Sequence, residues 1–448
     1  MPKKKTALTI EERLQQALVP AAEQPYEVPE NWVWVRLKSV ASWGSGGTPS
    51  RKHEEYYNGD ILWIKTGELN NGWIYDTEEK ITDEGLKKSS AKLFPPYSVL
   101  IAMYGATIGK VAILGVPATT NQACACAVCN KSLLYMYLFY YCISQKNVFI
   151  EKGKGGAQPN ISQIILKQHP IPLPPLFEQQ RIVERIEELF AKLDEAKERL
   201  QEVADSFAVR KAAILHKAFT GELIGKQVTE LVPLENLVDL IKIGPFGSSL
   251  HESDYIENGI PLVNPKHIVQ QRIVPQSKIS ISDEKAEELS SYKLKENDIV
   301  LGRRGEMGRC APISNREENW ICGTGSMIIR LKKEYDAKLY SLILGSQATV
   351  TYLENSAVGS TLKNLNEKIV RKIPVPQFSN EEQHEIVRLI DDLLARERSA
   401  QQAAEQALAS IDLMKKSILA RAFRGELGTN KASEASALEL LRQVLAED

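Results

Sequence analysis

The sequence predicts an α+β protein built from two α/β domains of short strands, each followed by a long helix. Three observations lead to this prediction. The chain of 448 residues is too long for one ordinary hydrophobic core. One long stretch of sequence occurs twice, and each copy ends in a heptad pattern of apolar residues. The expected order is therefore domain, helix, domain, helix.

Two motifs show the duplication. EQQRIVERI (178–186) returns as EQHEIVRLI (382–390), and KAFTGEL (217–223) returns as RAFRGEL (421–427), in both cases 204 residues later. Because the two motifs share one offset, the segments between them have the same length in both copies. The repeat is therefore a structural unit rather than a coincidence of composition.

A heptad pattern lies between the two motifs of each copy. In the first copy apolar residues recur alternately four and three residues apart, the 3.5-residue period of a coiled-coil seam. In the second copy smaller residues take several of these positions, so a small stripe can pack closely on a large one. The predicted seam comprises Ile182, Ile186, Leu189, Leu193, Ala196, Leu200, Val203 and Phe207, with Ile386, Ile390, Leu393, Glu397, Ala400, Ala404, Ala407 and Ile411 as the equivalents.

The length of the pattern decides between two interpretations. Two amphipathic helices could each be buried against their own domain, but one small domain cannot cover a stripe of about 40 residues. At 1.5 Å per residue such a helix spans roughly 60 Å, the dimension of a spacer. We therefore expect the two helices to pack on each other.

Proline and glycine residues predict where the helices begin and end, and with them the bounds of the domains. Each heptad segment begins after a proline-rich stretch that cannot continue a helix, and ends before a glycine suited to a C-terminal cap, Gly221 or Gly425. The predicted parts are an N-terminal extension (1–25), the first domain (26–176), the first helix (177–225), the second domain (226–379), the second helix (380–428) and a C-terminal tail (429–448).

The two domains correspond weakly in sequence. YSVLIAMYGATIGKVAIL (97–114) parallels ENDIVLGRRGEMGRCAPI (296–313), and each predicts a strand, a glycine turn and a second strand. GGAQPNIS (155–162) parallels VGSTLKNL (358–365). Elsewhere the domains diverge, so one scaffold with two different surfaces is expected to recognise two different targets.

Charge and cysteine content narrow the function classes. The net charge of −1 does not mark a nucleic-acid binder, yet residues 1–177 carry 19 basic against 15 acidic residues, and both helices and the tail are acidic. No apolar run of about 18 residues or signal-peptide core is present, so we expect a cytoplasmic protein without a membrane segment. The cysteines at 124, 126 and 129 lack metal-ligand spacing and a nearby histidine, and ACACAV is typical of a buried strand.

Together these features resemble one known family. The domain–helix–domain–helix order, the segment IPLPPLFEQQRIVERI, the motifs AFTGEL and AFRGEL, GGTPS (46–50) and GATIGK (105–110) are similar to the specificity subunits of Type I restriction-modification systems. The resemblance covers essentially the whole chain.

The resemblance implies a non-catalytic, sequence-specific DNA-binding subunit. Each domain would be a target-recognition domain that reads half of a bipartite target in double-stranded DNA. The two helices would pair as an antiparallel coiled coil and set the spacer. The expected partners are two modification subunits, which methylate adenine with S-adenosylmethionine, and restriction subunits, which cleave DNA with ATP and Mg²⁺. No cofactor or metal is expected on this chain itself.

Enzyme motifs do not support catalysis in this chain. GATIGK has three residues between its glycines and Val111 after the lysine, whereas a phosphate-binding loop needs four residues and Ser or Thr. NPKH (264–267) departs from the Asn-Pro-Pro-aromatic signature of amino-methyltransferases at its last two positions. The second function that we consider is a non-catalytic coiled-coil scaffold without sequence-specific DNA contact.

Candidate DNA contacts are basic and hydroxyl residues in glycine-rich turns. Arginine can reach guanine with two hydrogen bonds, while Lys, Ser and Thr more often contact phosphates. The adjacent Arg303 and Arg304 are the favoured pair, because two neighbouring guanidinium groups on a loop are costly without an anion. The candidates are Gly47, Thr48, Ser50, Arg51, Lys52, Tyr104 and Lys110 in the first domain, and Ser248, Ser249, Arg303, Arg304 and Arg309 in the second.

Overall fold

The computed structural model describes residues 8–153, 160–246, 249–356 and 364–447. The chain divides into two compact units, the first formed by residues 1–199 and 407–448 and the second by residues 200–406. Each unit contains one globular domain together with parts of two long helices.

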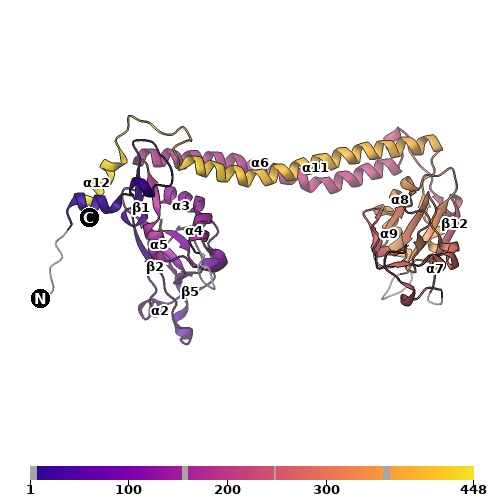
Figure 1. Cartoon of the computed structure of the whole chain (residues 1–448), viewed down its shortest axis with the longest axis horizontal. Coiled ribbons are helices and arrows are strands. Elements are labelled where there is room, and N and C mark those ends of the chain that lie inside the picture. Colours follow the sequence, from indigo (N-terminus) through magenta and orange to yellow (C-terminus); the bar gives the residue numbers. More distant parts are fainter. Residues whose placement is uncertain (1–7, 154–159, 247–248, 357–363, 448) are drawn as a thin grey trace. The chain divides into compact units, whose positions relative to one another are not determined.

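The globular part of the first unit, which carries the labels β1, β2 and β5 in Figure 1, is built on a five-stranded sheet in the order β2-β9-β6-β7-β4. A smaller sheet, β5-β3-β8, and a two-stranded pair, β1-β10, complete it. The strands are β1 (Val33–Arg36), β2 (Ala41–Ser45), β3 (Tyr57–Ile64), β4 (Trp73–Ile74), β5 (Lys80–Ile81), β6 (Val99–Ala102), β7 (Val111–Leu114), β8 (Thr119–Thr120), β9 (Cys124–Cys129) and β10 (Pro170–Leu173). The α-helices of this domain are α2 (Asp83–Lys87), α3 (Tyr135–Ser144), α4 (Lys146–Lys152) and α5 (Gln163–Gln168).

Both faces of the five-stranded sheet are buried. Val99 and Ile101 of β6 face a core shared with α3 and the long helices, whereas Leu100 and Ala102 face a second core against the small sheet. This alternation follows from the two-residue period of a strand. The cysteines at 124 and 126 lie in the second core, which confirms the prediction of a buried strand.

The second unit repeats this topology. The sheet β12-β20-β17-β18 corresponds to β2-β9-β6-β7, β16-β13-β19 corresponds to β5-β3-β8, and β11-β21 corresponds to β1-β10. In both small sheets the central strand has one antiparallel and one parallel neighbour. The strands are β11 (Val232–Pro233), β12 (Val238–Ile243), β13 (Ile260–Val263), β14 (Ile268–Val269), β15 (Arg272–Ile273), β16 (Ser280–Ile281), β17 (Asp298–Gly302), β18 (Cys310–Pro312), β19 (Ile321–Cys322), β20 (Ser326–Leu331) and β21 (Pro374–Val375).

The helices of the second domain cover its sheet as in the first. Ile299 and Leu301 of β17 face the core that contains α8, while Val300 faces the small sheet. One difference is the short hairpin β14-β15, which pairs only with itself, whereas β4 in the first unit joins the main sheet. The α-helices are α7 (Asp283–Glu288), α8 (Ala337–Leu344), α9 (Gln347–Ser356) and α10 (Glu367–Arg371).

Each domain is followed by one uninterrupted long helix, α6 (Leu176–Phe219) or α11 (Asn380–Ala422). The helix α6 starts directly after Pro174 and Pro175, and α11 starts at a capping box in which the Ser379 side chain accepts from the Glu382 amide. Gly221 and Gly425 follow the helix ends with φ of +82° and +75°, the left-handed conformation predicted for them.

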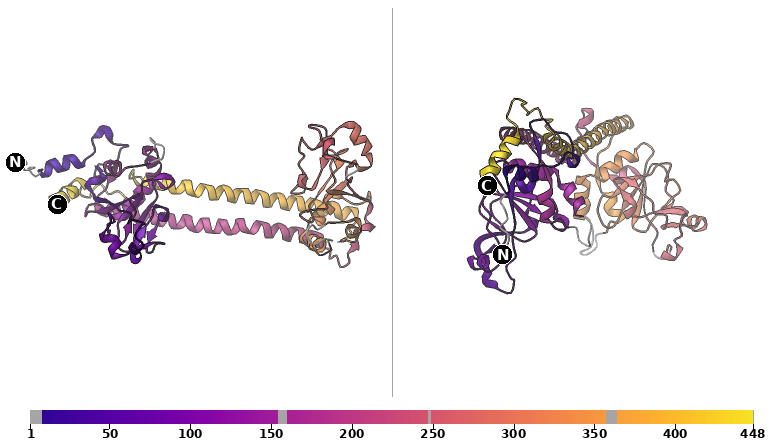
Figure 2. Two further views of the ribbon diagram at one scale, coloured as in Figure 1. Left: turned by 90° about the horizontal axis from the view of Figure 1, so that it is seen from below. Right: turned by 60° about the vertical axis from the view of Figure 1, so that its left-hand side comes forward.

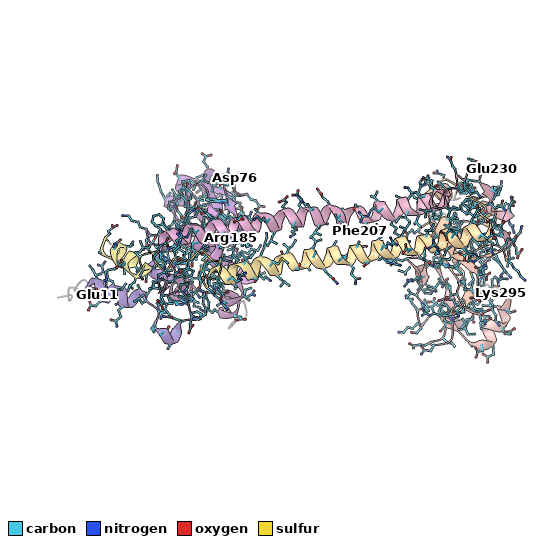
Figure 3. All side chains as sticks on the ribbon, turned by 90° about the horizontal axis from the view of Figure 1, so that it is seen from above. Glu11, Asp76, Arg185, Phe207, Glu230 and Lys295 are labelled. Carbon is cyan, nitrogen blue, oxygen red and sulfur yellow. The ribbon has the colours of Figure 1, made fainter. Side chains whose placement is uncertain are left out.

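The two long helices pack antiparallel within each unit. In the first unit Ile182 and Ile186, near the start of α6, share a core with Leu419 near the end of α11. In the second unit Ala218, near the end of α6, shares a core with Ile386. Figure 3 shows Phe207 on α6; the Arg210 guanidinium lies 4.4 Å from the ring centroid and pairs with Glu397 of α11 at 2.9 Å. The predicted antiparallel helix pair is confirmed.

The predicted seam positions are buried or partly buried except for three of them. Val203 is 45% exposed and Ala196 and Ala400 are also exposed, whereas Ala204 is partly covered and Phe207 and Ala404 are buried. Position 204 therefore takes the place of position 203 in the contact face, while Phe207 keeps its predicted place.

The two ends of the chain also form helices, which the sequence analysis treated only as an extension and a tail. Helix α1 (Ile10–Ala17) begins at a capping box formed by Thr9 and Glu12, and α12 (Ala437–Glu447) lies against α1 on the first domain (Figure 2). The Arg13 guanidinium donates to the carbonyl of Leu445 at 3.2 Å. Both helices contribute residues to the core of the first unit.

No helix within the described residues is long and apolar enough to span a membrane.

Candidate DNA interface

In the first unit, strand register brings the predicted contact loops to one edge of the main sheet. Ser45, the last residue of β2, pairs with Ala125, and Ala102, the last residue of β6, pairs with Cys124. The loop after β2, the turn between β6 and β7 and the loop before β9 therefore lie together. The first two of these loops carry all seven candidates of the first domain.

The second unit has the same edge. Ile243, the last residue of β12, pairs with Met327, and Gly302, the last residue of β17, pairs with Ser326. The loop after β12, the turn between β17 and β18 and the loop before β20 are thus the equivalents of the three loops in the first unit. The predicted correspondence of 97–114 with 296–313 is confirmed as strand, turn and strand.

Matching hydrogen bonds hold the turn in both units. The Met103 amide donates to the Ala123 carbonyl at 2.9 Å, and the Arg303 amide donates to the Gly325 carbonyl at 2.8 Å. On the other side, Tyr104 forms a β-bridge with Asn160, and Arg304 forms one with Asn364. The base of each turn is therefore fixed by segments that lie far away in the sequence.

Glycines in the left-handed conformation shape the turns themselves. Gly105 and Gly109 have φ of +63° and +75°, and Gly305 and Gly308 have φ of +82° and +74°. At Gly105 and Gly305 a Cβ atom would meet nothing within 4 Å. Glycine is required there by the backbone rather than by crowding, and each turn leaves space in front of it for a ligand.

Gly47 is not a surface contact residue, which corrects its prediction. A Cβ atom at this position would lie 2.2 Å from Ser90 Oγ, so the backbone needs glycine for close packing. Its carbonyl accepts from Trp63 Nε1 at 2.8 Å, and its amide donates to the Thr120 carbonyl at 2.9 Å. Gly47 fixes the loop after β2 from the inside.

The exposed candidates of the first domain follow Gly47 directly. Arg51 pairs with Glu79 at 2.6 Å, and its guanidinium carbon lies 4.3 Å from the ring centroid of Tyr57. These contacts hold the guanidinium at the surface in a defined position. Lys52 is exposed and, among the described residues, makes no ion pair. The hydroxyl residues are also exposed: Thr48 bonds to Gln122, and the Ser50 hydroxyl accepts from the Lys52 amide.

Tyr104 and Lys110 flank the turn of the first domain. Tyr104 is exposed, and its carbonyl accepts from the Thr107 hydroxyl at 2.8 Å. Lys110 is partly exposed, and its backbone closes the turn through bonds with Thr107 and Ala102. Both residues belong to the turn between β6 and β7.

Arg303 is buried, which corrects the expectation of two exposed neighbouring guanidinium groups. It is only 7% exposed, and its Nε donates to the Leu365 carbonyl at 3.1 Å. Its Nη1 has no partner among the described residues. Burial, with a smaller contribution from the neighbouring Arg304, lowers the pKa of Arg303 below its ordinary value. Arg303 holds the turn against the segment at 364–365.

Arg304 and Arg309 are the basic side chains that the turn of the second domain presents. Arg304 is exposed, and its Nε donates to Asn364 Oδ1 at 2.9 Å. Arg309 donates to the Pro265 carbonyl at 3.3 Å and pairs with Glu306. Ser249 is partly buried, and its amide donates to the Phe246 carbonyl. Ser248 lies outside the described residues.

Phe246 lies at this edge and was not among the residues predicted from the sequence. Its side chain is 55% exposed, and its ring centroid lies 5.4 Å from the Arg303 guanidinium carbon. An exposed aromatic ring beside a glycine turn suits apolar contact with a base or sugar. The alignment of GPFGSS (244–249) with the first-domain loop could have identified it.

Comparison with known proteins gives a consistent result. A family model described as Type I restriction modification DNA specificity domain matches residues 29–205 and 235–407. The chain is 29% identical over 298 residues to the specificity subunit of the Type I restriction enzyme MjaIX from Methanocaldococcus jannaschii, covering 62% of this chain and 68% of that protein. It is 25% identical over 457 residues to the EcoKI specificity subunit from Escherichia coli, covering 94% and 96%.

A solved structure shows the same fold. The crystal structure of the HsdS subunit from Thermoanaerobacter tengcongensis is 20% identical in sequence and aligns with a TM-score of 0.64 over 91% of this chain and 100% of that chain.

Proposed function

The chain belongs to the family of Type I restriction-modification DNA specificity subunits, and on this basis we propose how its two domains read DNA. Each domain places a glycine turn and two flanking loops at one sheet edge, and we propose that this edge enters a groove of the duplex. Arg304, Arg309 and Phe246 would contact one half-site. Arg51, Lys52, Tyr104 and Lys110 would contact the other.

One observation supports this proposal most strongly. The two edges have the same backbone architecture and bracing, but the side chains on them differ: Tyr104 stands where the second domain has Arg304. A shared scaffold with unlike contact residues is what recognition of two different half-sites requires, because base edges are distinguished by side-chain chemistry. A scaffold without DNA recognition would need no such edge.

We also propose the division of labour within the complex. This chain supplies DNA recognition, while two modification subunits bind S-adenosylmethionine and methylate adenine, and restriction subunits use ATP and Mg²⁺ to cleave DNA. The length of α6 and α11 sets the number of base pairs between the half-sites. The protein works in the cytoplasm, where its DNA is. The purified chain alone should transfer no methyl group from S-adenosylmethionine, and turnover without partners would contradict this assignment.

Selection from a randomised duplex library tests the recognition of DNA. The full chain is expected to enrich a bipartite motif with an unspecified spacer at a stated, near-physiological salt concentration. Salt-sensitive binding with no enriched motif would instead support the coiled-coil scaffold, whose DNA contacts would be purely electrostatic.

A further inference from the structure

A groove in the second unit lies between the hairpin β14-β15 and the two long helices. Its two adjoining parts have volumes of about 700 and 630 Å³. Lys211 of α6, Arg272 of β15 and Arg398 of α11 line both parts. We call this the cationic groove and define it by these three residues. None of the three makes an ion pair within the part of the chain that the structure describes.

The duplication shows that the opposing positive charges are not a general feature of the helix pair. The offset of 204 residues makes Lys211 equivalent to Lys415, and Arg398 equivalent to Asp194. In the first unit this pair of positions forms a salt bridge, with Lys415 Nζ 2.5 Å from Asp194 Oδ1. In the second unit the same two positions hold two cations on the walls of one groove. The acidic partner has been replaced by a second positive charge.

Nearby acidic groups do not neutralise these cations. Asp391 pairs with Lys338, and Glu397 pairs with Arg210. Glu317 lines the groove as well, but it lies beside Arg316, 3.9 Å away. The groove therefore keeps an excess of positive charge, which favours an anionic ligand over an empty, solvated state.

The cationic groove is continuous with the edge that carries the candidate DNA contacts. Gln270 and Gln271, at the tip of the hairpin, line both the groove and a second hollow formed by the turn at 305–309. Both glutamines have positive φ, 48° and 59°, in a two-residue turn that usually holds Asn and Gly. Arg309 lines that second hollow. The hairpin tip thus joins the cationic groove to the turn that carries Arg309.

We propose that the cationic groove binds backbone phosphates of the DNA duplex beyond the bases that the second domain reads. This inference rests on the proposed function, because it extends the same DNA-binding surface. Two long basic side chains that oppose each other across a groove suit phosphodiester oxygens, which accept hydrogen bonds from both walls. The shared hairpin tip favours DNA over an acidic protein segment, because a duplex held at the turn already lies next to the groove.

Two variants of the full chain test the proposal, each compared with a matched control. Lys211→Ala/Arg398→Ala removes both opposed cations. Arg398→Asp rebuilds the salt bridge that the first unit has, so it should leave thermal stability equal or higher. The control is Lys197→Ala/Lys416→Ala, which removes one exposed lysine from each of the same two helices. Affinity is measured against salt concentration on an arbitrary 30-base-pair duplex and on the duplex enriched by selection.

Both test variants should bind the two duplexes about ten-fold more weakly, and the salt slope of the affinity should fall by about two, roughly 0.9 per lost phosphate contact. The preference for the enriched duplex should stay unchanged, and the control should behave as the unmodified chain. Unchanged affinity and slope would overturn the proposal. Unchanged DNA binding with lost assembly onto modification subunits would also overturn it and assign the groove to an acidic protein segment. A failure of the proposed function is distinguishable, because the unmodified chain would then show no preference between the duplexes.

Discussion

Asn430, which follows α11, donates a hydrogen bond from its side-chain amide to the Glu178 carboxylate near the start of α6, at 2.9 Å. The duplication places Glu382 and Lys226 at the equivalent positions, and they form an ion pair at 2.8 Å. In each unit the beginning of one long helix is tied to the segment that follows the other. At these equivalent positions a polar contact supports the antiparallel packing of the helices in each unit, with a side-chain amide on the carboxylate in the first and an ion pair in the second.

The first prediction concerns the pH dependence of this contact. Glu178 is 0% exposed, and burial raises the pKa of its carboxyl group above the ordinary value, although Trp32 and Asn430 donate to it. Its contribution to stability is therefore complete below the pKa of the unfolded chain and is lost as the pH rises through the folded pKa. Glu178→Gln keeps an acceptor oxygen, so its thermal stability relative to the unmodified chain should increase as the pH rises above about 4, the ordinary pKa of a glutamate.

The equivalent substitution in the second unit, Glu382→Gln, is the control, because its effect on stability should change with pH in the opposite direction. Lys226 beside Glu382 lowers the pKa of that carboxyl group. Its contribution is present above the pKa of the unfolded chain and lost as the pH falls through the folded pKa. Glu382→Gln should therefore be less stable than the unmodified chain at neutral pH, and the difference should shrink on acidification. Parallel pH profiles for both variants would contradict this account.

The second prediction concerns a buried glutamine that occurs in both units. Gln179 accepts from the Leu134 amide at 2.9 Å and donates to the carbonyls of Ser132 and Pro174. Gln383 makes the same three kinds of bond in the second unit. Gln179→Ala leaves buried backbone groups without partners, so we expect a loss of about 2–4 kcal/mol in the free energy of unfolding.

The neighbouring Gln180 is the matched control for this change. Its side chain is exposed and, within the described residues, bonds only to Glu184 on the same helix. Urea unfolding of Gln180→Ala should give a loss within about 0.5 kcal/mol. Equal losses for the two alanine variants would show that Gln179 does not hold the domain to the helix.

The third prediction separates the neighbouring arginines of the second domain. Arg304→Ala removes an exposed side chain, so DNA affinity should fall by roughly 1–3 kcal/mol with an unchanged unfolding temperature. Arg303→Ala removes a buried side chain that bonds to the Leu365 carbonyl, so it should lower the unfolding temperature as well. Binding and calorimetry on both variants check this. A stable Arg303→Ala variant together with an unfolded Arg304→Ala variant would reverse the assignment.

The fourth prediction concerns the spacer. Deleting seven residues within 193–207 of α6 alone should shift the register of the helix pair and abolish or re-space target recognition. A matched second deletion within 400–414 of α11 shortens both helices by roughly 10 Å, about three base pairs of duplex. The motif enriched by the double-deletion chain should have unchanged half-sites and a shorter spacer. An identical spacer would exclude the helices as its determinant.

The sequence was sufficient to predict the features that local patterns encode. The shared offset of two motifs predicted the repeated unit, proline and glycine predicted the helix ends near Leu176 and Phe219, and ACACAV predicted the buried strand β9. The first glutamine of EQQ and EQH (Gln179 and Gln383) occurs in both copies of the repeat. Its hydrogen bonds to backbone groups far away in the sequence could not be predicted from this pattern. The helices α1 and α12 were missed, although Thr9 and Glu12 already form the pattern of a capping box.

Features that depend on distant segments could not be predicted from the sequence. Gly47 is buried because Ser90 and Trp63 close over it, and Arg303 is buried because the segment at 365 covers it. None of these covering segments is close in sequence to the residue that it covers. Gly47 and Arg303 therefore had the pattern of ordinary turn residues. Val203 was misplaced for a different reason, because the adjacent Ala204 takes its place in the contact face between Leu200 and Phe207.

The central claim is that the two domains read two separate half-sites on one duplex. Single-molecule sequencing of adenine methylation, in host cells with and without this gene, tests it most directly. The account predicts modified adenines within one bipartite motif whose halves are separated by a fixed, unspecified spacer, and loss of that modification when the gene is deleted. One uninterrupted motif, or a methylation pattern that the deletion leaves unchanged, would contradict it.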